Sequence, residues 1–227
     1  MKFLQCLTII FIILSIVAGT FLLPIAVAVY LRELATVPAF LIPMAVIWPL
    51  ALLLFFKTRR QPIRLTVREG ILLVCFAWLG AGLLGAVPFM LSGFVPHFSD
   101  AFFESVSGFT TTGASVLQNI ESYPMALRVW RTQMHWLGGM GIVALTVALF
   151  PLLGVGGFQL IKSETSGPDK GKVTAKITHT AKALWFIYLG MTVLQIVLLC
   201  IAGMPFLEAM CHSFSTLGTG GFSTQNT

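Results

Sequence analysis

Residues 98–115, FSDAFFESVSGFTTTGAS, decide how this chain is interpreted, because a related stretch returns 108 positions later as residues 206–223, FLEAMCHSFSTLGTGGFS. The two stretches align without a gap and place Asp100 opposite Glu208. Seven of the eighteen aligned positions are identical, namely Phe98 and Phe206, Ala101 and Ala209, Ser105 and Ser213, Ser107 and Ser215, Thr111 and Thr219, Gly113 and Gly221, and Ser115 and Ser223. The match predicts a duplicated structural unit.

Each copy combines a short helix with a segment of small residues. We expect amphipathic helices over residues 99–108 and 207–217, followed by Thr and Gly. Glycine permits the torsions that turn successive carbonyls toward one axis, and such carbonyls can replace the water around a cation. The negative carboxyl end of the helix favours a cation as well. The predicted potassium filter consists of Thr111, Thr112, Gly113, Thr219, Gly220 and Gly221, with the ion held at Thr111, Thr112, Thr219 and Gly220.

Acidic residues accompany both copies. We expect Asp100, Glu104 and Glu208 to make the pore entrance electronegative. Taken alone, three scattered acids in the first outer segment, Asp100, Glu104 and Glu121, are better explained as solvated surface.

The composition excludes a water-soluble fold. Of the 227 residues, 57% are hydrophobic and 10% are charged, which is too little charge to cover a soluble core. The net charge of +6 does not indicate nucleic acid, because ten of the fourteen basic residues cluster in two connectors. Those ten are Lys57, Arg59, Arg60, Arg64, Arg68, Lys162, Lys170, Lys172, Lys176 and Lys182. The four cysteines have neither metal-site spacing nor the density of a disulfide framework.

Five apolar runs approach the length of about 20 residues that a membrane-spanning helix needs. They lie near residues 3–30, 36–56, 70–93, 130–154 and 182–204. If both basic connectors face the cytoplasm, the amino terminus is also inside. Residues 97–118 and 205–225 are too apolar for free loops and too short for spans, so we predict that they are re-entrant loops.

Several residues carry a second interpretation. The run from Gly138 to Gly141 is typical of close packing between membrane helices. Arg131 and His135 share a helix face and could form a proton relay, although an arginine that extends to the interface beside a capping histidine fits better. The four histidines show no paired metal-binding spacing, and no nucleophile and base pattern indicates an enzyme.

The two loops, the run WLGGMG at residues 136–141 and the amino-terminal hairpin at residues 3–56 together resemble the TrkH/TrkG type of bacterial potassium uptake protein. The resemblance to this Trk/Ktr/HKT superfamily implies four helix, pore loop and helix units around one pore, each marked by one filter glycine. Gly113 and Gly221 match those glycines. The resemblance implies that a glycine at position 113 favours potassium over sodium. The resemblance also implies a homodimer, a cytoplasmic TrkA-type nucleotide-binding subunit and contact with membrane lipid.

These observations predict an all-α integral membrane protein with a hairpin at residues 1–60, a first repeat at 61–160 and a second repeat at 161–227 that stops after its filter strand. We therefore expect an amino-terminal fragment. The expected function is potassium translocation across the bacterial inner membrane, without an organic cofactor. A secondary transporter with broken helices that carries another cation or solute is the alternative, although it favours inverted repeats.

Overall fold

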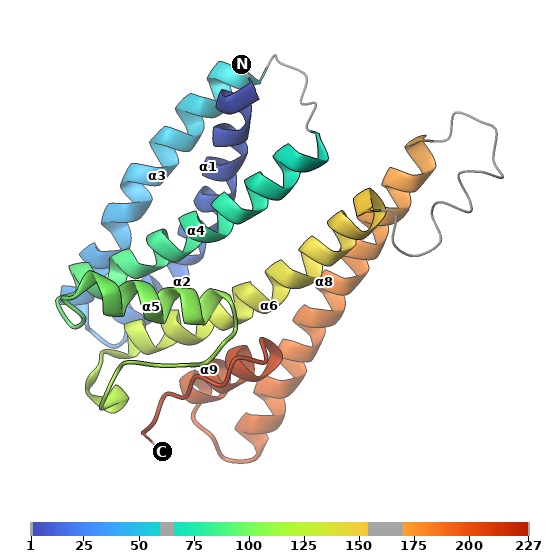
Figure 1. Cartoon of the computed structure of the whole chain (residues 1–227). Coiled ribbons are helices and arrows are strands. Elements are labelled where there is room, and N and C mark those ends of the chain that lie inside the picture. Colours follow the sequence, from blue (N-terminus) through green and yellow to red (C-terminus); the bar gives the residue numbers. More distant parts are fainter. Residues whose placement is uncertain (1, 60–65, 154–169, 227) are drawn as a thin grey trace.

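Long apolar segments of this chain form helices because a helix satisfies its own backbone hydrogen bonds, which lipid cannot do. The computed structural model describes residues 2–59, 66–153 and 170–226, and at residues 2, 67, 142–153 and 170–181 it describes the backbone alone (Figure 1). The helices are α1 (Lys2–Thr20), α2 (Leu22–Tyr30), α3 (Val37–Thr58), α4 (Val67–Leu91), α5 (Phe98–Phe109), α6 (Met125–Leu153), α8 (Lys170–Ile201) and α9 (Phe206–Leu217), with short 3-10 turns η1 (Leu34–Thr36) and η2 (Ile120–Ser122). The expected all-α fold is confirmed: the described residues contain no strand.

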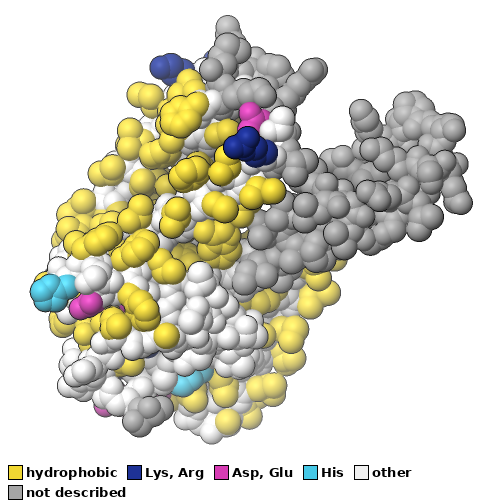
Figure 2. Space-filling view, in the orientation of Figure 1, with side chains coloured by type: hydrophobic (Ala, Val, Ile, Leu, Met, Phe, Trp, Pro, Cys, Tyr) yellow, Lys and Arg dark blue, Asp and Glu magenta, His cyan; other side chains and the backbone are white. Residues whose placement is uncertain are grey.

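Four helical segments in the described part of the chain are long and apolar enough to cross a membrane. They are Phe3–Tyr30, Leu34–Thr58, Arg68–Leu91 and Lys182–Ile201, and α6 adds a helix of 29 residues. Many of their large apolar side chains point outward, including Leu53 and Phe76, and Figure 2 shows hydrophobic side chains spread over the face formed by the first helices. Such a surface suits lipid and would be costly in water.

The first predicted span is interrupted at Phe21, between α1 and α2. Pro24 has no backbone N–H and therefore leaves the Thr20 carbonyl without its helical donor. The Gln133 side chain of α6 donates a hydrogen bond to that carbonyl at 2.9 Å. The break thus becomes a joint between the amino-terminal hairpin and α6.

A buried aromatic cluster continues this joint. Trp130 of α6 packs edge-on against Phe21 and Phe40, with ring centroids 4.7 and 6.4 Å away. Its indole N–H donates to the carbonyl of Gly85 in α4 at 3.0 Å, so the ring is buried without an unpaired polar atom. The hairpin, α4 and α6 therefore share one core.

The amino end of α6 is capped from the hairpin. The Glu33 carboxylate accepts hydrogen bonds from the Met125 and Ala126 N–H groups at 2.8 and 3.1 Å. Free N–H groups at a helix start favour a negative charge, so Glu33 stabilises α6 from 92 residues away. The sequence interpretation assigned no role to Glu33.

The two basic connectors are flanked by ends of the long helices. In Figure 1, α3 and α6 end, and α4 and α8 begin, at the same end of the molecule. Lys57, Arg59 and Arg68 lie there, while Arg60, Arg64 and Lys162 lie outside the described residues. The second connector is partly helical, because α8 begins at Lys170 rather than at the predicted boundary of 182.

Both short helices form as the sequence predicts. Helix α5 packs against α4 and α6, and α9 packs against α6 and α8. Each short helix therefore lies between two long ones, and α6 contacts both.

Candidate functional site

The two short helices end in the same hydrogen-bonded turn. At the end of α5, the N–H groups of Thr111 and Thr112 donate to the carbonyls of Gly108 and Ser107 at 3.1 and 2.9 Å. In the second copy the donors are Thr219 and Gly220, and the acceptors Thr216 and Ser215 are both 2.9 Å away. This pair of bonds defines a Schellman cap, in which the residue after the cap adopts a left-handed conformation.

Threonine occupies that left-handed position in both copies. Thr111 has φ of 55° and Thr219 has φ of 54°, which is rare for a β-branched residue. The sequence interpretation expected glycine to provide this conformation. Gly113 and Gly221 do have positive φ, 77° and 89°, but they come two residues later. Backbone strain of this kind concentrates at functional sites, which marks the turn as a candidate.

The two turns touch each other through their backbones. A Cβ atom on Gly113 would overlap the carbonyl oxygen of Gly220, whereas a Cβ atom on Gly221 would meet nothing within 4 Å. The first and second Thr and Gly segments are therefore in van der Waals contact, and only glycine fits at position 113.

Helix α6 brings the carboxyl ends of α5 and α9 together. A Cβ atom on Gly138 would overlap the carbonyl oxygen of Phe109, the last residue of α5. A Cβ atom on Gly139 would lie 2.9 Å from the Cα of Gly218, the C-cap residue that follows α9. The prediction of close packing at this glycine run is correct, and its partners are the ends of the two short helices. Their negative ends consequently meet at one level of α6.

The predicted filter residues differ in exposure. Thr112, Thr219 and Gly221 are exposed, Thr111 and Gly113 are half-buried, and Gly220 is buried. Gly220 lies against His135, because a Cβ atom there would overlap the imidazole ring. A polar cavity of about 280 Å³ opens beside the turns and is lined by Gly113, Leu117, Ile120, Arg131, Gly221, Phe222, Ser223, Gln225 and Asn226.

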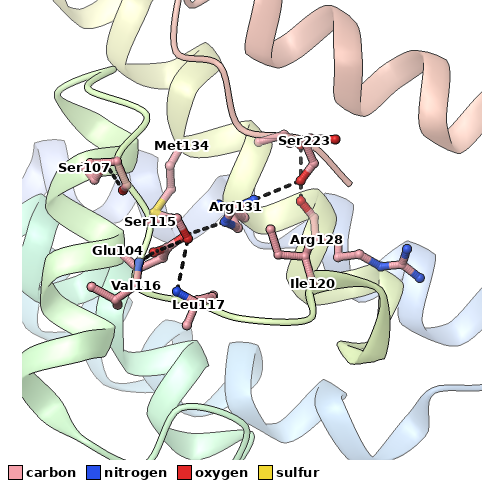
Figure 3. A network of polar contacts seen from close by, with 12 residues as sticks. Glu104, Ser107, Ser115, Val116, Leu117, Ile120, Arg128, Arg131, Met134 and Ser223 are labelled. Atoms are coloured by element: carbon pink, nitrogen blue, oxygen red, sulfur yellow. Dashed lines mark hydrogen bonds and ion pairs between the residues drawn. The ribbon is translucent and has the colours of Figure 1, made fainter. Parts of the chain in front are cut away.

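The structure corrects the role expected for Glu104. Asp100 and Glu208 are half-buried, but the Glu104 side chain is completely buried. It forms an ion pair with Arg131, which is only 3% exposed. A buried carboxylate that is neutralised by arginine does not make an open entrance electronegative. Figure 3 shows this pair at the centre of a polar network.

The interpretation of Arg131 as an interface residue is also wrong, because this arginine is buried and contacts both copies. Two signals in the sequence point to the pair: an arginine within an apolar helix, and a glutamate on the short amphipathic helix. Charges at membrane depth usually have a partner of opposite sign.

Outside the spanning helices, partial burial and then the nearby Glu104 charge raise the pKa of the Tyr123 phenol, while Arg131 opposes this shift. Tyr123 therefore remains neutral at physiological pH.

Beyond the turns, the two copies are joined at their outer ends. Asn226 accepts a hydrogen bond from the Ile120 N–H at 2.8 Å and donates to the side chain of Asn119 at 3.1 Å. Its own N–H donates to the Glu121 carboxylate at 3.0 Å. This outer clasp, formed by Asn119, Ile120, Glu121 and Asn226, has no recognisable sequence motif.

His135 is buried against the second copy. Its ring stacks on Phe222 with centroids 4.0 Å apart, and its Nδ1 atom lies 3.2 Å from the Ser215 hydroxyl. Among the described residues, the Nε2 atom meets no hydrogen-bond partner, which differs from the expectation of a fully satisfied histidine. Within the described part of the chain, no three His, Cys, Asp or Glu side chains gather in a way that could hold a metal ion.

Apolar long helices and a repeated short helix with its turn define a multi-pass membrane protein built from helix and loop repeats. Residues 36–227 match the family described as TrkH, a cation transport protein. The chain belongs to this TrkH family.

Characterised relatives agree with this assignment. The chain is 41% identical over 229 residues to the Trk system potassium uptake protein TrkH of Vibrio parahaemolyticus, covering 100% of this chain and 47% of the relative. It is 36% identical over 205 residues to TrkG of Escherichia coli K12, covering 89% and 42%. The crystal structure of the potassium transporter TrkH from V. parahaemolyticus superposes with a TM-score of 0.84 and 38% identity, covering 99% of this chain and 45% of that one. The chain spans about half the length of the curated relatives it matches.

Proposed function

We propose that this chain supplies two of the filter segments of a potassium-selective pathway across the bacterial inner membrane. The observation that carries the proposal is the repeated Schellman cap, which sets Thr111 and Thr219 in the same strained conformation two residues before Gly113 and Gly221. Relatives at 36 to 41% identity carry the names of potassium uptake proteins.

Within this pathway, backbone carbonyls of residues 111–113 and 219–221 replace the water around a dehydrated potassium ion. The ion is held at Thr111, Thr112, Thr219 and Gly220. The contact of Gly113 with the Gly220 carbonyl limits how closely the two segments can approach, and the converging ends of α5 and α9 add negative potential. Asp100 and Glu208 attract cations toward the outer mouth, whereas Glu104 has a different role.

Four such segments complete a ring, so the remaining two come from elsewhere in the assembled protein. The resemblance to Trk proteins supports a homodimer of the full-length protein and a TrkA-type nucleotide-binding subunit on the cytoplasmic side. Lys57, Arg59 and Arg68 at one end of the bundle support a cytoplasmic amino terminus and contact with anionic lipid.

The direction in which the two repeats run argues against the alternative of a secondary transporter with inverted repeats. In Figure 1, α4 and α8 run in the same general direction, and each is followed by its short helix. Inverted repeats would require opposite directions.

The test uses a full-length chimera, in which residues 1–227 replace the aligned part of the V. parahaemolyticus relative. The chimera and the intact relative are reconstituted in liposomes, and potassium and sodium fluxes are compared. We expect potassium-selective flux from both proteins. A chimera that folds and inserts but conducts neither ion, or both ions equally, would contradict the proposed function.

A further inference from the structure

The two Thr and Gly segments lack a backbone connection that would fix the distance between them. Among the described residues, no main-chain hydrogen bond joins residues 110–116 to residues 218–224. Their direct contact, Gly113 against the Gly220 carbonyl, prevents closer approach but does not prevent separation. A filter made of carbonyls needs both a lower and an upper limit on the distance between its segments, so other groups must hold the segments together.

Arg131 reaches the second segment by two contacts. Its Nη1 atom donates a hydrogen bond to the Ser223 carbonyl at 2.9 Å. Its guanidinium plane lies over the Phe222 ring, with the central carbon 3.7 Å from the ring centroid. A charged donor and a cation–π contact together hold the backbone just after Gly221.

The same guanidinium reaches the first segment through Glu104. Its Nε atom donates to the Glu104 carboxylate. That carboxylate accepts hydrogen bonds from the Ser115 hydroxyl at 3.0 and 3.1 Å, and from the Val116 N–H at 3.3 Å. Ser115 and Ser223 are equivalent positions of the repeat. The connection therefore joins corresponding points of the two copies, as Figure 3 shows.

We propose that Arg131 is a positioning residue that sets the spacing of the two filter segments and thereby the preference for potassium over sodium. This inference rests on the proposed function. The guanidinium does not touch the ion. It acts through Glu104 on one side and through Ser223 and Phe222 on the other.

The geometry of arginine is essential to this role. A planar guanidinium can donate in two directions and stack on a ring at the same time, whereas a lysine ammonium is a point charge on a flexible stem. Arg131→Lys therefore keeps the charge that neutralises Glu104 but loses the connection to one of the two segments. A residue that served only to balance the buried charge would tolerate this change.

The experiment measures the ratio of potassium to sodium permeability in the chimera carrying Arg131→Lys. We expect the ratio to fall about tenfold, which corresponds to about 1.4 kcal/mol of differential ion binding, while potassium flux persists. Arg128→Lys is the matched control, since Arg128 lies on the same helix but contacts the second segment through a single bond to the Thr224 carbonyl at 3.3 Å. We expect the control to keep the ratio of the parent.

If Arg131→Lys does not fold, the neutral double variant Glu104→Gln with Arg131→Gln replaces it, because this variant leaves no unpaired buried charge. It too should conduct with a reduced ratio. A parental ratio in either folded variant would overturn the proposal. Failure of both variants to fold would also overturn it, because the bridge would then serve folding alone. Failure of the proposed function is a separate result, visible as absent selectivity in the parent chimera.

Discussion

The first loop, residues 97–118, and the second loop, residues 205–225, reach the same backbone turn with different side chains. In the first, Thr110 and Thr112 are exposed, and their hydroxyls hydrogen-bond to each other at 2.8 Å. In the second, the equivalent positions are Gly218 and Gly220, and both are buried against His135 of α6. The turn thus depends on its cap hydrogen bonds, while the neighbouring helix decides which side chains fit.

The loops also differ in whether their short helices place a charged side chain in the buried interior. Glu104 on α5 is completely buried and paired with Arg131, but the equivalent His212 on α9 is half-buried and lies outside the network formed by the described residues around Arg131. One copy provides the acid, and both copies are held by the arginine that it neutralises. The repeat is therefore symmetric in backbone and asymmetric in charge.

The largest expected effect comes from removing the acid that only the first copy has. Glu104→Ala leaves Arg131 buried without its counter-charge, which should lower the free energy of unfolding by about 4 kcal/mol. His212→Ala, at the equivalent position, should change stability by less than about 1 kcal/mol. Thermal unfolding of the purified protein in detergent measures both. Equal losses would show that the ion pair contributes nothing special to the first copy.

The next effect concerns the two glycines with positive φ. Gly113→Ser places a Cβ atom onto the Gly220 carbonyl and should cost about 3 kcal/mol, with a lower potassium to sodium ratio as the segments separate. Gly221→Ser meets open space and should cost only the conformational strain of about 1 kcal/mol. Unfolding and ion flux of the two variants are compared side by side. A larger loss at position 221 would contradict the observed contact.

A smaller effect tests the packing against His135. Gly220→Ala should cost about 2 kcal/mol, because the added methyl group overlaps the imidazole ring, while Thr112→Ala at the exposed equivalent position should be nearly neutral. Adding His135→Ala to Gly220→Ala should recover part of the stability, measured again by thermal unfolding. If the double variant recovers no stability, the loss in Gly220→Ala does not arise from the contact with His135.

The smallest effect concerns what the two loops share. Thr111→Gly and Thr219→Gly each remove a β-branched side chain from a left-handed position, and each should stabilise the fold by about 1 kcal/mol. Because glycine frees the turn, we expect lower potassium selectivity in both variants. Stabilisation of one variant alone would mean that the two caps are not equivalent.

Much of the architecture could be predicted because it depends on local patterns. The apolar runs, the short amphipathic helices and the repeat of 18 positions are visible in the chain itself. The close packing at Gly138 and Gly139 was also predictable, since small residues in an apolar helix allow close approach. The identity of the groups that approach was not predictable, because they are backbone atoms of distant residues.

The charged site shows where sequence reasoning reaches its limit. Glu104 on a short amphipathic helix is compatible with an entrance acid, and Arg131 near a helix start is compatible with an interface anchor. Only packing of α5 against α6 buries both side chains and forces them to pair. Asn226 and Glu33 likewise gain their roles from partners about 100 positions away, for which no local pattern exists.

The sequence by itself determined the all-α membrane class of the protein and the duplicated loop, because hydropathy and repetition are properties of the order of residues. The tertiary structure decided that the two loops touch at Gly113, that Arg131 joins them, and that the amino-terminal hairpin caps α6 through Glu33. These facts depend on which surfaces meet when the helices pack, and an individual segment does not contain that information.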